Sequence, residues 1–223
     1  MMHADIDFLR ELNKPGREEL ARAFLPRTYA KKSLMFSPRD ERDAVFIITK
    51  GRARVYLAYE DKEFTLAILE RGDVYSTHTR AYVAALQDTT IMSAETAHIH
   101  RQLLRIPEFT GTMVRVLGDV LTHSINIIDN LAFLDVEKRL KSFLRYECDR
   151  ACARAGQGCQ APAPQQPDRG VLLDLGLTTE HLASLLGTTR QTLSTILNTL
   201  AKDGILELRG RGLIHVPDPE ALG

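Results

Sequence analysis

Apolar and polar residues alternate over residues 44–69 of the chain. An apolar run at 45–48 comes first, and the alternation continues after a Lys50-Gly51 turn. A period of two residues is typical of strands that bury one face, and the charged and glycine-containing breaks are typical of hairpin turns. The pattern therefore predicts an antiparallel β-domain at roughly residues 27–105.

The periodicity changes to that of a helix between residues 107 and 134. The positions that recur three and four residues apart are Met113, Leu117, Val120, Ser124, Ile127, Leu131 and Leu134. A helix of about 27 residues is about 40 Å long, which is more than a β-domain of this size can cover. We therefore expect a dimerisation helix that pairs with its copy in a homodimer. A helix packed only within its own chain is the alternative.

A second helical domain is expected after Asp135, which is placed to cap a helix starting at Val136. The Pro/Gln/Gly-rich stretch 156–170 is predicted to be a surface loop. Two short amphipathic patterns then meet at Gly187. Their spacing is typical of a helix-turn-helix, with Thr178 as the cap of its first helix.

Residues of the second short helix have the chemistry for reading DNA. Thr188 or Thr189 can cap this helix, and the cap and first turns leave polar side chains outward. Arginine bonds the two acceptors of guanine, and glutamine matches the donor and acceptor of adenine. Two β-runs follow as a wing, with arginines at its tip for phosphates. The expected DNA-binding residues are Thr188, Thr189, Arg190, Gln191, Ser194, Thr195, Arg209 and Arg211.

Composition changes this picture little. The 223 residues carry zero formal net charge, so global charge does not indicate a nucleic-acid partner. We see no secretory signal and no membrane span, and a cytoplasmic location is expected. Cys148, Cys152 and Cys159 lack a fourth ligand and a known metal-site spacing, so no metal is expected there.

A β-domain, a long helix and a terminal winged helix, in this order, resemble the family of catabolite activator and fumarate-nitrate regulators (CRP/FNR). The segment GRARVYLAYEDKEFTLAILERGDVYSTHTRA at 51–81 is similar to the carbon-monoxide-sensing haem branch of that family, as is TTRQTLSTILNTL at 188–200. The resemblance implies an α+β fold. Its parts are an N-terminal β-roll (double-stranded β-helix) domain at 1–106, the dimerisation helix at 107–134 and a winged helix-turn-helix domain at 135–223.

The same resemblance implies a haem b cofactor, carbon monoxide as the signal and transcription activation as the output. It assigns His78 as an axial ligand of the haem iron, and the Met1 amine of a partner subunit as the opposite ligand. His3 or a methionine sulfur could compete with that amine. It also assigns Val114, Leu117 and Gly118 to the gas pocket. Palindromic promoter DNA and RNA polymerase are the implied partners.

Other readings stay open at this stage. The stretch 87–90, Gln-Asp-Thr-Thr, has no arginine where cyclic-nucleotide relatives hold a phosphate, which favours other signals. Nitric oxide, a redox signal or an organic effector are the alternatives within the regulator class. No acid-base pair of a haem peroxidase is visible, so we expect no enzyme. His98 and His100 are predicted on a strand, and His123 is either a core histidine or a haem neighbour.

Overall fold

The computed structural model describes residues 8–40, 43–79, 81–105, 107–154, 170–210 and 212–223. Its backbone forms two compact units, Met1–Ile128 and Asp129–Gly223, and the division between them falls inside the long helix. Among the described residues, no helix has both the length and the apolar character needed to cross a bilayer.

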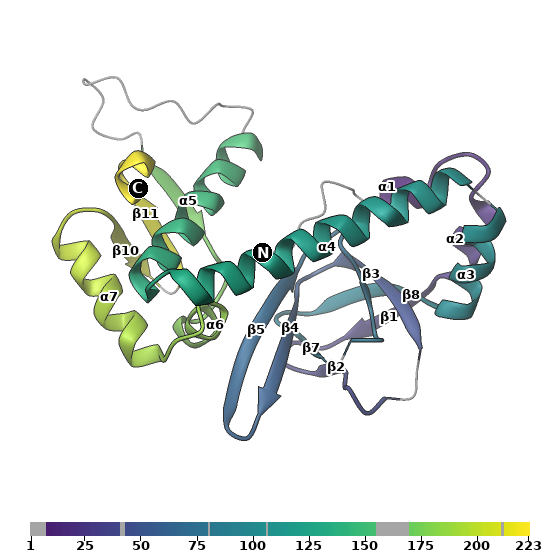
Figure 1. The fold of residues 1–223 in the computed structure, drawn as a ribbon, viewed down its shortest axis with the longest axis horizontal. Helices are drawn as coiled ribbons and strands as arrows, with labels where there is room; N and C mark the ends of the chain where they lie inside the picture. The colour runs from purple at the N-terminus through teal and green to yellow at the C-terminus, as the bar shows by residue number, and fades with distance from the viewer. Residues whose placement is uncertain (1–7, 41–42, 80, 106, 155–169, 211) are drawn as a thin grey trace. The chain divides into compact units, whose positions relative to one another are not determined.

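The first unit combines short helices with two sheets (Figure 1). In chain order its elements are α1 (Phe8–Leu12), α2 (Glu18–Ala23), β1 (Leu25–Tyr29), β2 (Leu34–Phe36), β3 (Ala44–Lys50), β4 (Ala53–Tyr59), β5 (Lys62–Leu69), β6 (Val74–Ser76), β7 (Tyr82–Ala85), β8 (Thr89–Glu95), α3 (Thr96–Arg105) and α4 (Pro107–Phe133), the last of which continues into the second unit. The expected N-terminal β-roll domain is thus confirmed.

The strands pair antiparallel in the orders β1-β8-β3-β6 and β2-β7-β4-β5. Strand β3 is covered on both faces. Phe46 and Ile48 belong to the core between the sheets, whereas Val45 and Ile47 pack with the helices α1 to α4. A strand buried on both sides needs apolar residues at successive positions, which explains the uninterrupted run at 45–48.

Helix α3 corrects one sequence prediction. His98 and His100 lie on this helix, so the strand predicted for them is wrong. Ile99 and Gln102, three residues apart, are both 3% exposed and form its buried face. The single apolar residue between two histidines imitates a period of two, although the local period is helical.

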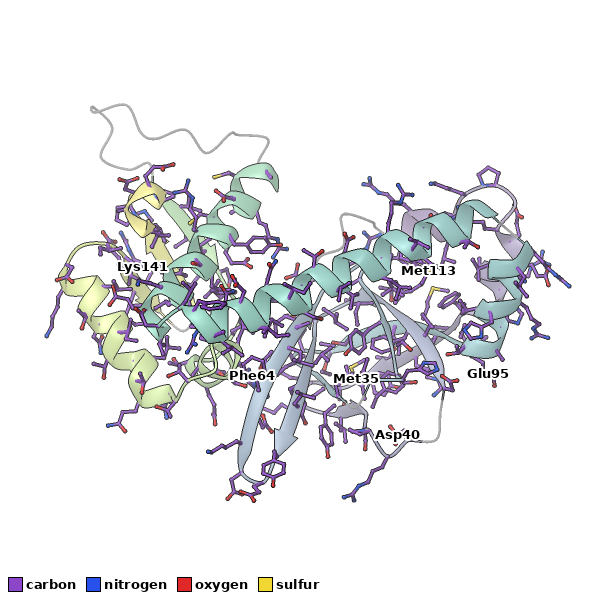
Figure 2. The ribbon with its side chains drawn as sticks, in the orientation of Figure 1. Met35, Asp40, Phe64, Glu95, Met113 and Lys141 are labelled. Atoms are coloured by element: carbon purple, nitrogen blue, oxygen red, sulfur yellow. The ribbon has the colours of Figure 1, made fainter. Side chains whose placement is uncertain are left out.

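Helix α4 has apolar residues on two faces. Met113, labelled in Figure 2, and Val120 are both assigned to the predicted dimer seam. Both are partly buried and pack on the core of the first unit, to which Val116 also belongs. His123 Nε2 donates to the backbone oxygen of Leu66 in β5 at 3.0 Å, which adds a polar anchor on that side. The exposed apolar stripe consists of Val114, Leu117, Leu121, Ile125 and Ile128.

The second unit contains one three-stranded sheet in the order β10-β11-β9, with helices around it. Its elements after α4 are α5 (Val136–Arg154), β9 (Val171–Asp174), α6 (Thr179–Leu185), α7 (Arg190–Lys202), β10 (Glu207–Gly210), β11 (Leu213–Val216) and the 3-10 helix η1 (Pro219–Leu222). Asp135 Oδ1 accepts from the backbone N–H of Lys138 at 2.8 Å, which confirms the predicted cap. Apart from Gly170, the loop predicted at 156–170 lies outside the described residues.

Candidate functional site

The helix-turn-helix of the second unit is fixed by caps at both of its helix starts. Thr178 Oγ1 accepts from the backbone N–H of His181 at 3.1 Å, and Thr189 Oγ1 accepts from that of Thr192 at 3.2 Å. Gly187, between the helices, has a φ of +63°, a value that glycine adopts without strain. Of the two threonines considered for the second cap, Thr189 takes this role.

Helix α7 has one face in the core and another open to solvent. Leu193, Leu197 and Leu200 are buried, as the sequence predicts, whereas Ile196 is only half-buried. The opposite face is polar. Thr189, Arg190, Gln191 and Thr195 are exposed, and Thr188 is half-buried.

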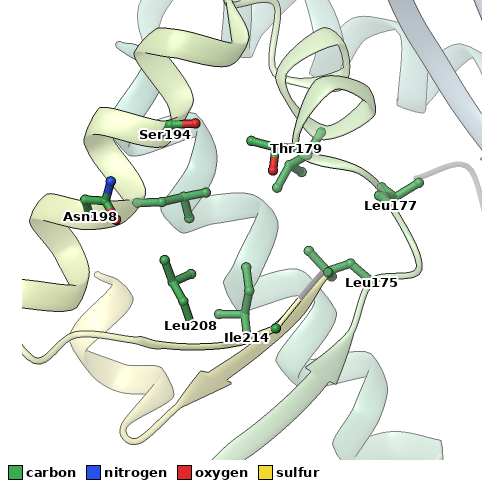
Figure 3. Close-up of a pocket in the computed structure, with 11 residues that line it drawn as sticks. Leu175, Leu177, Thr179, Ser194, Asn198, Leu208 and Ile214 are labelled. Atoms are coloured by element: carbon green, nitrogen blue, oxygen red, sulfur yellow. The ribbon is translucent and has the colours of Figure 1, made fainter.

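Ser194 differs from these outward residues. It lines an open pocket of about 180 Å³ between α6, α7 and the wing strands, and Asn198 lines the same pocket one turn later (Figure 3). The remaining lining residues are mainly leucines, including Leu175, Leu177 and Leu208. Ser194 is therefore half-buried on the wing side of the helix, and Gln191 and Thr195 lie on its open side.

The wing is the hairpin of β10 and β11. Arg209 lies on β10 and is exposed, and its Nε donates to Glu207 Oε2 at 2.8 Å. That hydrogen bond holds the pKa of the Glu207 carboxyl below its usual range. Sequence reasoning missed Glu207, although a strand places residues two apart on one face. Arg211, the second predicted wing arginine, lies outside the described residues.

His78 lies in the connection between β6 and β7, and its side chain is 52% exposed. The loop is pinned just before it, because Thr77 and Ala44 exchange two hydrogen bonds of 2.9 Å. His78 Nδ1 lies 2.7 Å from Ser76 Oγ, and Nε2 lies 2.7 Å from Asp43 Oδ1. Asp43 is 35 residues away in the sequence, and no spacing indicates it.

The predicted gas-pocket residues share the open face of α4. Val114 is 63% exposed and Leu117 is 64% exposed, and a Cβ added to Gly118 would meet nothing within 4 Å. Within the described residues of one chain, these positions form a surface without an outer wall. Met1, the predicted second iron ligand, lies outside those residues, as does His3.

Asp88, in the 87–90 stretch that lacks an arginine, has a structural role. It belongs to the turn after β7, whereas the His78 loop precedes that strand, so the two are at opposite ends of β7. Its carboxylate accepts from the backbone N–H of Lys31 at 2.9 Å and so ties this turn to the segment after β1.

The cysteines differ from one another. Cys148 is fully buried, and burial raises the pKa of its thiol to about 11. Cys152 is disulfide-bonded, which the sequence does not predict. Among the described residues, no group of three or more His, Cys, Asp or Glu side chains could hold a metal ion.

Comparison with known proteins places this architecture in a family. Residues 138–223 match the Crp-like helix-turn-helix domain. The solved structure of a CooA mutant from Carboxydothermus hydrogenoformans is 40% identical, covers 99% of this chain and 96% of its own, and has a TM-score of 0.84. The chain therefore belongs to the CRP/FNR family of transcription regulators, and it resembles CooA in particular.

Two further relatives differ in their signals. The reduced Fe(II) form of the CO-sensing protein from Rhodospirillum rubrum is 30% identical, with 96% of each chain covered and a TM-score of 0.53. The global nitrogen regulator of Nostoc sp. is 26% identical and covers 90% of this chain and 91% of its own. The family and its transcriptional role are thus common to these relatives, whereas the signal varies among them.

Proposed function

We propose that this chain is a haem-dependent, carbon-monoxide-responsive transcription activator. The observation that carries this proposal is the accessible imidazole of His78, which stands on a pinned loop in a chain 40% identical to CooA. A neutral imidazole is a common ligand of haem iron.

The donors around His78 fit this role. Ser76 Oγ is within hydrogen-bond distance of Nδ1, and such a partner fixes the tautomer and the orientation of a ligating imidazole. His78 would then hold haem b through Nε2, and Asp43 would give up its contact with that atom. Reduced haem iron supplies the affinity for carbon monoxide, which the protein's side chains lack. The Met1 amine of a second copy is the proposed opposite ligand.

The open stripe of α4 supports a homodimer. Five apolar side chains, spaced three and four residues apart, are 55% to 66% exposed. A second copy of α4 would cover them and would close Val114, Leu117 and Gly118 into a small apolar pocket. In this proposal the 107–134 helix serves both dimerisation and gas recognition.

The proposed output is recognition of palindromic promoter DNA and contact with RNA polymerase. Base edges would be contacted by Arg190, Gln191 and Thr195. The phosphates of the DNA backbone would be contacted by Thr188, Thr189 and the wing arginines, which would fix the orientation of the protein on the duplex. Ser194 would contact DNA from the side of α7 that faces the wing. The dimer would have two arrangements of its DNA-binding helices, related by a hinge near Leu134 and Asp135. The signal would favour one arrangement only by as much as it binds that arrangement more tightly than the other.

A signal other than carbon monoxide is the second candidate, because the chain is also 26% identical to the global nitrogen regulator of Nostoc sp.. Nitric oxide, a redox signal and organic effectors belong to this alternative, and cyclic nucleotides are its less favoured member. In each case the DNA-binding output is the same.

Absorption spectra of the haem-supplied protein test the proposal. We expect low-spin bands in the reduced protein, a shift of those bands under carbon monoxide, and loss or change of both in His78→Ala. His100→Ala is the matched control, because this exposed histidine of the same unit should leave the spectra unchanged. A protein that takes up no haem would refute haem sensing. Binding to promoter DNA raised by cyclic nucleotide but not by carbon monoxide would favour the second candidate.

A further inference from the structure

We propose that Glu207 is an electrostatic brake on the wing. In the free protein it holds the guanidinium of Arg209, which must leave this carboxylate before it can contact a DNA phosphate. The inference rests on the DNA-binding function of the second unit and deepens it. It assigns a residue that sets how strongly, and with what salt dependence, the wing contributes to binding.

The geometry converges on one oxygen. Arg209 Nε donates to Glu207 Oε2 at 2.8 Å, and a second nitrogen of the same guanidinium contacts that oxygen. Across the hairpin, Glu207 pairs in register with His215, whose Nδ1 lies 3.4 Å from the same Oε2. All three side chains therefore lie on one face of the wing.

Arg209 is free to exchange partners. Its side chain is 59% exposed, and that of Glu207 is 46% exposed. Ion pairs at such exposure are weak because water and salt screen them. A guanidinium binds phosphate with the same fork geometry that it uses for a carboxylate, so a DNA phosphate can take the place of Glu207.

His215 remains beside Glu207 when Arg209 leaves. Its ring is only 18% exposed and stands against Gly170, where an added Cβ would lie 2.2 Å from Nε2. The backbone at Gly170 therefore limits how far the ring can move. The lowered pKa of Glu207 keeps its carboxylate ionised near neutral pH, so the pair with Arg209 adds no net charge to the wing.

The test is Glu207→Gln, measured with a duplex selected from a random pool by the wild-type protein. Anisotropy titrations of full-length variants in one effector state should show tighter binding in the variant. In the wild-type complex Glu207 still competes with the phosphate for Arg209, so the variant gains up to one phosphate contact per wing. Each such contact steepens the salt dependence of log K by about 0.9. For a dimer with two wings, the gain should therefore fall about tenfold between about 50 and about 200 mM salt.

Two comparisons isolate the brake. In an Arg209→Gln background, Glu207→Gln should change affinity less than about twofold, because nothing is left to release. Asp149→Asn removes another arginine-paired carboxylate, on α5 of the same unit, and should leave affinity and salt slope unchanged. Thermal unfolding of each variant confirms that it is folded.

An equal gain from Glu207→Gln with and without Arg209 would overturn the brake, since the carboxylate would then act only by repelling DNA. An unchanged salt slope would also overturn it. A wild-type protein that retains no duplex would count against DNA binding itself, an outcome distinguishable from both.

Discussion

The two units of the molecule build their candidate sites differently. In the second unit, the exposed residues Arg190, Gln191 and Thr195 stand on one regular helix, whose start is fixed by the Thr189 cap. In the first unit, His78 stands on a loop, and one of its partners, Asp43, comes from a distant segment. A surface on one helix is complete within one chain. A site made from a loop and an exposed helix face needs a further protein surface to cover that face.

The apolar stripe of α4 is the surface that lacks a cover among the described residues of a single chain. Leu117 and Leu121 are more than 60% exposed, although the buried leucines of either core are at most 7% exposed. Exposed stripes of this kind indicate an interaction surface. The candidate effector site of the first unit therefore lacks an outer wall in the described part of a single chain, whereas the candidate DNA-contacting residues of α7 are already presented on one exposed helix face.

The largest expected effect separates the stability of the two units. Phe46 is fully buried and stacks on Phe36 at a centroid distance of 4.8 Å, so Phe46→Ala should cost about 3–5 kcal/mol. Leu193 is fully buried in the second unit, and Leu193→Ala should lower the free energy of unfolding by about 2–5 kcal/mol. Calorimetry should show each variant shifting only the transition of its own unit. A single transition lowered by both variants would show that the units unfold together.

Local signals were predictable from sequence. The caps at Thr178 and Asp135, the glycine turn and the buried leucines of α7 follow from rules that span a few residues. The period of two in the β-roll also predicted the sheets correctly. These features depend on neighbours along the chain, which a sequence displays directly.

Non-local features were not predictable. Met113 and Val120 seemed part of the dimer seam because α4 is apolar on two faces, and only packing decides which face is covered. The contact of Asp43 with His78 depends on the pairing of β3 with β6.

An intermediate effect tests whether the second unit reads sequence. Arg190→Ala should weaken binding to the selected duplex by about 1–3 kcal/mol and relax the preference at one base pair, if its guanidinium bonds a base. Lys202→Ala is the matched control, because this exposed cation is in the last turn of the same helix. Selection from random duplexes with each variant measures the preference. An equal loss for every sequence would place Arg190 on a phosphate instead.

The smallest expected effect tests whether a local cap stabilises the second unit. The hydrogen bond from the Lys138 backbone lowers the pKa of Asp135, so its carboxylate is favoured in the folded state. The stabilisation is therefore fully present above the unfolded pKa of about 3.9 and is lost as the pH falls through the lower folded value. Chemical unfolding of Asp135→Ala at several pH values measures it.

The difference in unfolding free energy between wild type and Asp135→Ala should be constant near neutral pH and should shrink in acid. Asp135→Asn keeps a side-chain acceptor at the cap without a titrating group. The difference between the asparagine and alanine variants should therefore not depend on the titration of residue 135. If the wild-type difference persists at a pH below the folded pKa, the carboxylate charge does not contribute. The cap would then act only as a neutral hydrogen-bond acceptor, and the second unit would gain no pH dependence from this residue.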